Sequence, residues 1–400
     1  MRDAIVIGLG LAGLSAALRL AQAGRRVLLV GKGSGGLQLS QGTIDILGYC
    51  PQAVTRPLDA ISALPAEHPY ASVGAQRVRD AIGWLRDELG QELLVGDLED
   101  NYLLPTAVGA MRPTALTQPS MLAAHGARSY AVVGVRQLKD FPAELMAGNL
   151  GAKVGWVDLQ ARPGEADPSA LTYARAMDDP SFAARFGRAV AAAAPEGEVI
   201  LLPAVLGTKP GLWRQVAEAV GRPIAEVPLP PPSVPGYRLN EALVAKVKAA
   251  GVRVIIGSKV TGFTADGDRI VSVQLAAAGG LRDLSADAFV YAPGGFASGA
   301  ISVDSRGAIS ETLFGLPLTA TDANDLIGPE YWAEHPLFQV GARAGVDGRA
   351  VDADSRVVRS NLYLAGDIIA GAERWSEKSG DGIATATAVR AADSILGGVA

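Results

Sequence analysis

The first hydrophobic blocks of the chain are two short runs separated by a glycine-rich turn and an apolar segment. Ile5-Val6-Ile7 is β-branched without a polar residue, which is typical of a strand buried on both faces of a parallel sheet. The apolar segment from about Leu11 to Ala23 predicts a helix, because Gly24 follows it as a stop signal. Residues 26–30 predict a second strand. The N-terminal segment therefore predicts a β–α–β unit.

Hydrophobic runs and amphipathic segments alternate again in the middle of the chain. In order they predict a strand, a helix, a strand, two helices, a strand and a helix, at about residues 129–134, 139–150, 154–158, 169–177, 181–193, 198–202 and 213–220. Residues 93–118 resemble short strands and turns, and the proline-rich segment 227–236 predicts a polyproline-type return to the first part of the chain. We therefore expect two domains. Residues 1–92 and 228–400 form the first, and residues 93–227 form an inserted α/β and β-layer region for substrate or partner.

The C-terminal part predicts a helix at about 239–250 and strands at about 252–256, 259–265, 269–275, 281–285 and 288–292. Two of the predicted strands are followed by glycines. The pair Gly294-Gly295 comes after residue 292, and Gly366-Asp367 comes after the strand near residue 362. An alanine-rich segment from Gly382 predicts the last helix.

The glycines Gly8, Gly10 and Gly13 stand between the first strand and helix at the spacing G-x-G-x-x-G. The first permits a tight turn, the second lets the backbone approach a diphosphate, and the third allows close packing of the helix on the strand. Leu11 and Ala12 begin the helix, whose N-terminus supplies unpaired N–H groups and a positive dipole end. The pattern predicts a nucleotide cofactor on a Rossmann-like α/β fold, with a purely structural glycine turn as the alternative.

The residue after the second strand departs from the usual dinucleotide fingerprint. An Asp or Glu normally binds the adenosine ribose at this point, but this chain has Gly31-Lys32. Either the ribose is held in another way, or the cofactor has no adenosine half. Lys32 is a candidate for binding an anion, and a flexible loop with a solvated lysine is the alternative.

Two segments in the body of the chain carry residues suited to a flavin. Ser40, Gly42 and Thr43 lie in a loop of small polar residues that can donate hydrogen bonds to a flavin ring or its phosphate, unless the loop is an ordinary one. Gly294 and Gly295 follow a buried strand and allow its backbone to approach a cofactor closely.

The C-terminal segments extend the same pattern. Gly366-Asp367 places Asp367 at the carboxyl edge of the sheet, where it can accept a hydrogen bond from a ribityl hydroxyl. Gly382 and Ile383 begin the last helix, whose positive end can stabilise the negative charge of a reduced flavin. Because a nicotinamide-only domain does not need the far C-terminus, the order of these signals predicts a flavin.

Composition and charge exclude several classes of protein. The 400 residues have a net charge of −5 without a basic tract, so we expect no nucleic-acid partner. The single cysteine, Cys50, excludes an intrachain disulfide and a self-contained iron–sulfur cluster. The three histidines lack metal-ligand spacing, so we expect no metal site. Neither a signal peptide nor 18 consecutive apolar residues is present, which predicts a cytoplasmic chain that reaches a membrane only through a partner.

Several motifs together resemble the B subunit of the anaerobic glycerol-3-phosphate dehydrogenase, a family of the fumarate reductase-like flavoprotein superfamily. The glycine fingerprint is shared by that superfamily, whereas the His-Pro-Tyr and Pro-Pro-Ser-Val motifs are more specific. The segments that carry the resemblance are Gly8–Gly13, Gly42–Asp45, His68–Tyr70, Gly74–Arg77, Leu229–Val234 with Arg238-Leu239, and Leu364–Asp367. Lys378–Gly382 departs from it, because this helix start often carries a longer glycine run.

The resemblance implies a flavin-binding domain like that of fumarate reductase and succinate dehydrogenase, with an inserted second α/β lobe. It implies oxidation of sn-glycerol 3-phosphate to dihydroxyacetone phosphate, with electrons relayed towards quinone and then fumarate or nitrate. It implies FMN as the cofactor, with FAD as the alternative, and two partners: the catalytic A subunit, which carries a flavin, and the membrane-associated iron–sulfur C subunit. The chain would then lie in the cytoplasm, peripheral to the inner face of the cell membrane.

The catalytic residues are not identified by a motif. His68, Arg112 and Arg238 are the candidates for binding a substrate anion; the alternatives are that Arg112 pairs with a carboxylate and that His68 makes a structural polar contact. His68, His125 and His335 are the candidates for deprotonating the substrate, and none stands in a recognisable catalytic pattern. Three interpretations remain open: a flavin-bearing electron carrier that works with a separate catalytic chain, a free-standing flavin dehydrogenase or reductase for another small acid or alcohol, and a flavin-free scaffold that docks partners.

Overall fold

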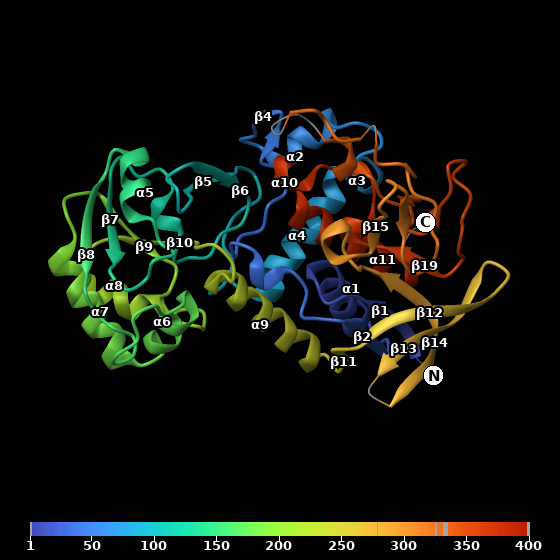
Figure 1. Ribbon diagram of the computed structural model, residues 1–400, viewed down its shortest axis with the longest axis horizontal. Coiled ribbons are helices and arrows are strands. Elements are labelled where there is room, and N and C mark those ends of the chain that lie inside the picture. Colours follow the sequence, from blue (N-terminus) through green and yellow to red (C-terminus); the bar gives the residue numbers. More distant parts are fainter. Residues whose placement is uncertain (1, 278, 325, 331–334, 398–400) are drawn as a thin grey trace.

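The computed structural model describes residues 2–277, 279–324, 326–330 and 335–397. Figure 1 shows two α/β lobes: the middle of the chain, in green, forms one, and both chain ends lie in the other. The hairpin of β5 (Tyr102–Pro105) and β6 (Met111–Thr114) and the helix α9 (Val234–Ala249) lie between them.

The larger sheet of the described chain has seven strands in the order β11-β2-β1-β14-β13-β12, with β19 also paired to β14. Its parallel members are β1 (Arg2–Ile7), β2 (Val27–Gly31), β11 (Arg253–Ile256), β19 (Leu362–Leu364) and the second half of β14 (Gly280–Tyr291). The strands β12 (Lys259–Asp266), β13 (Arg269–Ala277) and the first half of β14 form an antiparallel meander. Phe289–Tyr291 pairs with β1 and with β19, so these three strands end at the same edge.

Alternation of side chains along β1 divides the core in two. Ala4 and Val6 join one hydrophobic cluster, whereas Ile5 and Ile7 join another, as expected when successive side chains point to opposite faces of a sheet. All four are buried, which accounts for the uninterrupted apolar run.

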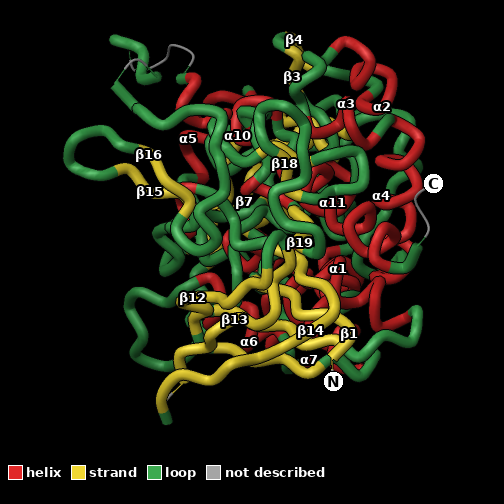
Figure 2. Tube along the Cα trace, turned by 90° about the vertical axis from the view of Figure 1, so that its right-hand side faces the viewer, coloured by secondary structure: helices red, strands yellow, loops and turns green. Residues whose placement is uncertain are grey.

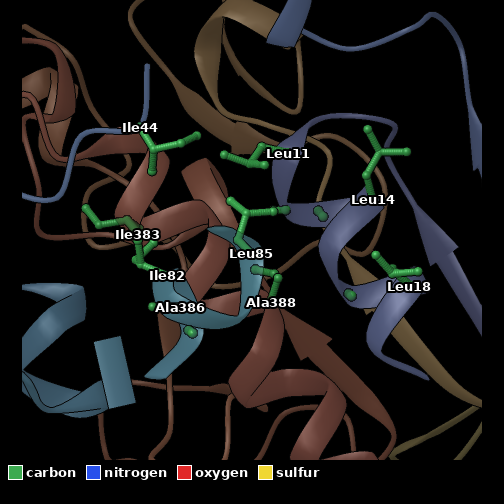
Figure 3. Packing of buried hydrophobic residues seen from close by; sticks show 14 of the residues in the cluster. Leu11, Leu14, Leu18, Ile44, Ile82, Leu85, Ile383, Ala386 and Ala388 are labelled. Carbon is green, nitrogen blue, oxygen red and sulfur yellow. The ribbon is translucent and has the colours of Figure 1, made fainter. Parts of the chain in front are cut away.

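Three helices cover the first face. They are α1 (Leu11–Gln22), α4 (Ala75–Leu89) and α11 (Gly380–Ile395), and Figure 3 shows Leu14 and Leu18 of α1, Leu85 of α4 and Ala388 of α11 packed in one cluster. The small side chains of α11 let it lie against α1, so the two ends of the chain share one core. Short elements at the rim of this lobe are α2 (Pro57–Ala60), α3 (Pro69–Val73), α10 (Arg374–Glu377), β3 (Tyr49–Cys50) and β4 (Gln52–Ala53).

On the opposite face of the parallel strands, buried residues of β1 and β2 pack with residues of the antiparallel meander and of the irregular segments that follow it (Figure 2). Tyr291 lies edge-on to Phe314 at a ring distance of 4.9 Å, and its hydroxyl donates to Glu311 Oε1 at 2.6 Å. The short pairs on this side are β15 (Ile301–Val303) with β16 (Ile309–Glu311), and β17 (Arg343–Ala344) with β18 (Ala350–Val351).

The second lobe has a four-stranded parallel sheet in the order β10-β9-β7-β8. Its strands are β7 (Tyr130–Val135), β8 (Lys153–Val157), β9 (Val199–Pro203) and β10 (Ile224–Val227), and its helices are α5 (Ala143–Leu150), α6 (Ala170–Met177), α7 (Pro180–Ala193) and α8 (Trp213–Val220). Its hydrophobic core begins at Leu104 and includes Leu229 and Val234, whereas Leu93 and Leu98 pack in the first core. The core boundaries therefore differ from residues 93 and 227 by several positions.

Several predicted elements have different limits in the structure. Helix α5 begins at Ala143, four residues later than predicted, because Pro142 stands at its N-cap and cannot donate within a helix. Helix α9 begins inside the proline-rich segment, because Ser233 caps it and Pro235 occupies its first turn, where proline is tolerated. Strand β14 is continuous across the predicted break after residue 285, and β10 was not predicted.

A buried ion pair joins the two lobes. Arg238 of α9 donates to both carboxylate oxygens of Glu226 in β10, at 2.6 and 2.9 Å. Arg238 also donates to the side chain of Gln118, whose Nε2 donates in turn to the Gly42 carbonyl at 3.0 Å. The loop around residue 42 is therefore fixed by the contact between the lobes. No helix in the described ranges is both long and apolar enough to span a membrane.

Candidate functional site

The predicted cofactor glycines meet at the carboxyl edge of the large sheet. A Cβ on Gly8 would lie 1.9 Å from the Ala292 carbonyl oxygen, and a Cβ on Gly295 would lie 2.7 Å from Oδ2 of Asp367. A Cβ on Gly366 would lie 3.0 Å from that of Ala12. Strand ends far apart in the sequence thus approach one another so closely that glycine is required. The structure places Gly8, Leu11, Ala12, Gly13, Gly294, Gly295, Gly366 and Asp367 in this one region.

The turn between β1 and α1 has room for a ligand at one position. A Cβ on Gly13 would lie 1.8 Å from the Gly8 carbonyl oxygen, so this glycine lets the helix pack on the strand. A Cβ on Gly10 would meet nothing within 4 Å. The space beside Gly10, at the N-terminus of a 12-residue helix, therefore suits the diphosphate of a dinucleotide.

A cavity of about 280 Å³ continues from this turn past the end of β2. Gly31, Lys32, Val260 and Tyr291 are among its lining residues. A Cβ on Gly31 would lie 2.3 Å from Cδ1 of the buried Leu9, so an acidic side chain at this position would have to displace that leucine. A side chain at residue 31 would therefore need Leu9 to move, and glycine leaves this end of the cavity open beside Lys32.

A second cavity, of about 500 Å³, lies between the loop around residue 40 and the start of α11. Three cationic and three carboxylate side chains line it, together with small and aromatic residues. The lining residues are Ser40, Gln41, Asp45, Arg112, Asp367, Arg374, Trp375, Lys378, Gly380, Asp381 and Ala384. We call it the charged cavity.

Of the predicted loop residues Ser40, Gly42 and Thr43, only Ser40 lines the charged cavity. Thr43 lines a neighbouring cavity of about 290 Å³ that shares Gln41 and Arg112 with it. Gly42 is buried against α9, because a Cβ there would lie 2.3 Å from that of Pro235. Its conformation, with φ of +79°, also requires glycine.

Gly382 and Ile383, predicted to place the positive end of the last helix near a flavin, both use their backbone N–H groups within the chain. The Gly382 N–H donates to the Asp45 carbonyl at 2.8 Å, and the Ile383 N–H donates to the Ser379 carbonyl at 3.0 Å. Neither donor is left for a flavin ring. The residues of this helix that line the charged cavity are Gly380, Asp381 and Ala384.

Two carboxylates meet at the wall of the charged cavity. Asp45 accepts hydrogen bonds from the Arg112 guanidinium and, at 2.7 Å, from the Thr114 hydroxyl. Asp381 Oδ2 accepts the backbone N–H of Asp45 at 3.3 Å. Burial, and secondly the charge of Asp45, raises the pKa of Asp381 from 3.8 to about 7.

Two further cations line the same cavity. The Arg374 Nε lies 3.1 Å from Oδ1 of Asp367, and the same guanidinium donates to the Ala372 carbonyl at 3.3 Å. Burial lowers the pKa of Arg374. Burial, and secondly the nearby Arg112, lowers the pKa of Lys378. Burial removes part of the hydration of each cation, which costs free energy. An anionic ligand that hydrogen-bonds to these cations would offset this cost.

Of the three catalytic candidates, only Arg112 reaches the charged cavity. His68 is buried, its Nδ1 accepts the Tyr70 N–H at 3.1 Å, and its Nε2 lies 3.1 Å from Glu377 Oε2. Although burial acts in the opposite direction, hydrogen bonds from His68 and Ser379 lower the pKa of Glu377. His68 borders a different cavity, and Arg238 is engaged in the buried pair between the lobes.

Sequence reasoning did not single out Asp381, Arg374 or Lys378. Lys378 and Asp381 lie within the segment Lys378–Gly382 and Arg374 lies four residues before it, so the departure of this segment from the family pattern was the available signal. No group of three or more side chains able to hold a metal ion occurs among the residues that the structure describes.

The chain is similar to one protein family and to several known proteins over most of its length. The family described as "FAD binding domain" matches residues 3–383. A Halobacterium salinarum protein, named as a probable B subunit of anaerobic glycerol-3-phosphate dehydrogenase, is 32% identical over 409 residues, covering 96% of this chain and 95% of that protein. A Vibrio cholerae protein, named as the B subunit of anaerobic glycerol-3-phosphate dehydrogenase, is 28% identical, covering 98% of this chain and 96% of that protein. The solved structure of an open flavocytochrome c3 fumarate reductase is 12% identical, covers 99% of this chain and 78% of that chain, and has a TM-score of 0.45.

Proposed function

This chain belongs to the FAD-binding family and, within it, to the family of anaerobic glycerol-3-phosphate dehydrogenase B subunits, and from this premise we propose that it takes part in oxidising sn-glycerol 3-phosphate to dihydroxyacetone phosphate. Its electrons pass towards a quinone, with fumarate or nitrate as the terminal acceptor. The observation that carries the proposal is the position of the charged cavity. It lies where the predicted cofactor residues Ser40 and Asp367 stand beside three cations.

The cofactor is a flavin, and we propose that it is FAD. The turn at Gly8–Gly13 would hold the diphosphate, and the cavity beside Gly31 and Lys32 would hold the adenosine. Asp367 and Ser40 would hold the flavin half, on the side of the charged cavity. A bound flavin supplies a two-electron acceptor for the alcohol. FMN, which the sequence resemblance implies, remains the alternative and would leave the cavity beside Gly31 unused.

The substrate's phosphate would bind the cations of the charged cavity. Arg112, Arg374 and Lys378 all line this cavity, so a phosphate group there would meet three cationic side chains. Guanidinium groups bind phosphate oxygens by charge-assisted hydrogen bonds, which are stronger than neutral ones. Arg112 is supplied by β6, so the hairpin between the lobes would contribute to the phosphate site.

The relatives are named as subunits, so we propose that the chain acts in a complex. A catalytic A subunit with its own flavin would share the oxidation, and a membrane-associated iron–sulfur C subunit would carry electrons away. The single cysteine, Cys50, supports this division, since one thiol cannot hold an iron–sulfur cluster. The complex would lie at the inner face of the cell membrane.

The test uses the complex purified with its partners, and the chain purified alone, under anaerobic conditions. We expect sn-glycerol 3-phosphate to bleach the flavin of the chain, and glycerol at the same concentration to leave it yellow. Arg112→Gln should raise KM for the phosphate ester by about tenfold or more, since one charge-assisted contact contributes about 1.5–3 kcal/mol. Arg128→Gln is the matched control, because its side chain is 90% exposed and lies in the second lobe.

Three results would contradict the proposal. One is a complex that shows no bleaching with glycerol 3-phosphate. Another is equal bleaching by glycerol, which would show that the phosphate is not recognised. The third is an Arg112→Gln variant with the KM of the control variant. Bleaching in the complex but not in the chain alone would assign the oxidation to the partner and a relay role to this chain.

A further inference from the structure

We propose that Asp381 is the group that accepts the hydroxyl proton of an alcohol phosphate bound in the charged cavity, and that Asp45 is a positioning residue for it. The inference rests on the proposed function and deepens it. Asp381 stands in the first turn of α11 and lines the cavity together with Arg112 and Lys378. It therefore lies beside the cations that would hold the phosphate.

The hydrogen bonds distinguish the two carboxylates. Asp45 is occupied on both oxygens, since Oδ1 accepts the Thr114 hydroxyl and Oδ2 accepts Arg112. Asp381 uses Oδ2 for the Asp45 N–H, and within the described part of the chain no hydrogen bond reaches its Oδ1. One oxygen of Asp381 is thus available to a ligand in the cavity, whereas neither oxygen of Asp45 is.

The other groups near Asp381 that could accept the proton, Asp367, Glu377 and Tyr70, are engaged elsewhere. Asp367 lies against Arg374, and Glu377, just outside the cavity, is held by His68 and Ser379. Tyr70 cannot serve as a base at neutral pH, because burial and secondly Asp381 raise its pKa well above 10. Its hydroxyl donates to the Ile46 carbonyl at 2.8 Å.

The local charges set the protonation of Asp381. Asp45 from the loop, Arg112 from β6, Lys378 at the end of α10 and Tyr70 from α3 surround it. Burial and Asp45 raise its pKa to about 7, while Arg112 acts in the opposite direction. A base whose pKa lies near the working pH combines a useful deprotonated fraction with a useful affinity for the proton.

The proposed step conserves atoms and electrons. The O–H bond of the substrate's secondary alcohol breaks and its proton goes to Oδ1 of Asp381. A bound flavin would supply the two-electron acceptor for the hydride, which must leave the same carbon with both electrons of its C–H bond. The C=O bond of the ketone forms. The proton then leaves Asp381 for solvent through the open side of the cavity.

The experiment compares Asp381→Asn, Asp381→Glu and Asp393→Asn in the purified complex. Asp393 is the matched control, since it lies on the same helix, near its other end, and pairs with the half-exposed Arg19. We expect Asp381→Asn to lower kcat by about 10²-fold or more while the dissociation constant of glycerol 3-phosphate, measured by calorimetry, stays within about threefold. The rise of kcat/KM with pH near 7 should disappear, and Asp381→Glu should partly restore the rate.

A second readout does not depend on activity. Between about pH 4 and pH 7, the Asp381 carboxyl keeps its proton in the folded state but has lost it in the unfolded chain. The free energy of unfolding of wild type should therefore fall as pH rises through this range. Asp381→Asn of the chain alone, unfolded in urea, should lack this fall, and Asp393→Asn should keep it.

The outcomes separate the inference from the proposed function. If Asp381→Asn keeps the kcat and pH profile of Asp393→Asn while wild type is active, the assignment of Asp381 is overturned and the function stands. If the urea midpoints of Asp381→Asn and wild type change equally with pH, the proton is not held by Asp381 and the assignment is overturned as well. If wild type is inactive with glycerol 3-phosphate, the proposed function fails, and the assignment fails with it.

Discussion

The backbone N–H of Asp45 donates to the carboxylate of Asp381 over 3.3 Å, across 336 residues of sequence. The carbonyl of Asp45 accepts the N–H of Gly382 in return, at 2.8 Å. This exchange fixes the loop after the first β–α–β unit to the start of the last helix. Both ends of the chain therefore form one wall of the charged cavity, and neither end can form it alone.

Two variants of the glycine turn should separate an effect on stability from an effect on flavin binding. Gly13→Ala places a methyl 1.8 Å from the Gly8 carbonyl oxygen, so we expect a loss of more than about 3 kcal/mol in unfolding free energy. Gly10→Ala meets nothing within 4 Å and should cost about 1 kcal/mol or less. It should nevertheless weaken flavin binding by about tenfold or more, because its methyl occupies the space proposed for the diphosphate.

Urea unfolding of the flavin-free variants gives the stabilities, and fluorescence titration with FAD gives the affinities. Equal stability losses for the two variants would contradict the packing role of Gly13. An unchanged affinity in Gly10→Ala would place the diphosphate elsewhere.

The buried pair of Arg238 and Glu226 predicts that a single variant loses much more stability than the double variant. Arg238→Met leaves the carboxylate of Glu226 buried without its partner, which should cost about 3–5 kcal/mol. The double variant Arg238→Met/Glu226→Leu should recover most of this loss, because no charge remains buried. Thermal and urea unfolding of the flavin-free chain measure both, and a double variant as unstable as the single one would refute the explanation.

Stability at acid pH follows from the same pair. Burial acts to raise the pKa of Glu226, but the charge and hydrogen bonds of Arg238 lower it below 4.5 overall. Because the folded state loses this proton more readily than the unfolded state, the contribution is complete above about pH 4.5 and is lost as pH falls through the folded pKa. Glu226→Gln should flatten this part of the pH–stability curve, and an unchanged slope would assign the acid sensitivity to other groups.

Tyr70 connects the loop at Ile46 with the start of the last helix at Ser379 through its hydroxyl group. Its hydroxyl donates to the Ile46 carbonyl at 2.8 Å and lies 3.3 Å from the Ser379 carbonyl. Tyr70→Phe should cost about 1–3 kcal/mol, because a buried carbonyl loses its donor. It should also weaken flavin retention, measured as absorbance after gel filtration.

Tyr130→Phe is the matched control for this effect. Its hydroxyl donates to the Ala124 carbonyl at 2.9 Å in the second lobe, away from the charged cavity. It should cost stability but keep the flavin. Equal flavin loss in both variants would mean that general destabilisation, and not the position of Tyr70, controls retention.

Local sequence predicted the parts of the site that depend on backbone approach. Gly8 and Gly13 are required by close contacts with neighbouring backbone, Gly8 with the end of β14 and Gly13 with the turn before its own helix, and such contacts leave a glycine pattern that can be recognised in sequence. Periodicity also predicted most strands and helices, because each buries one stripe or face. The limits of α9 were missed because Ser233 caps the helix within a proline-rich run.

The charged side chains of the cavity could not be predicted in the same way. Asp45, Arg112 and Asp381 come from a loop, a hairpin strand and a helix, and only the packing of the lobes brings them together. The sequence predicted a helix start near Gly382, but not that its N–H donates to the Asp45 carbonyl. No local pattern records such long-range partners.

The most direct test of the account is the flavin content of the purified wild-type chain. Acid release followed by mass spectrometry identifies the cofactor, and absorbance gives its amount per chain. We predict about one FAD per chain, held across the Gly8–Gly13 turn and the charged cavity. A colourless chain that takes up neither FAD nor FMN on dialysis would contradict the central claim.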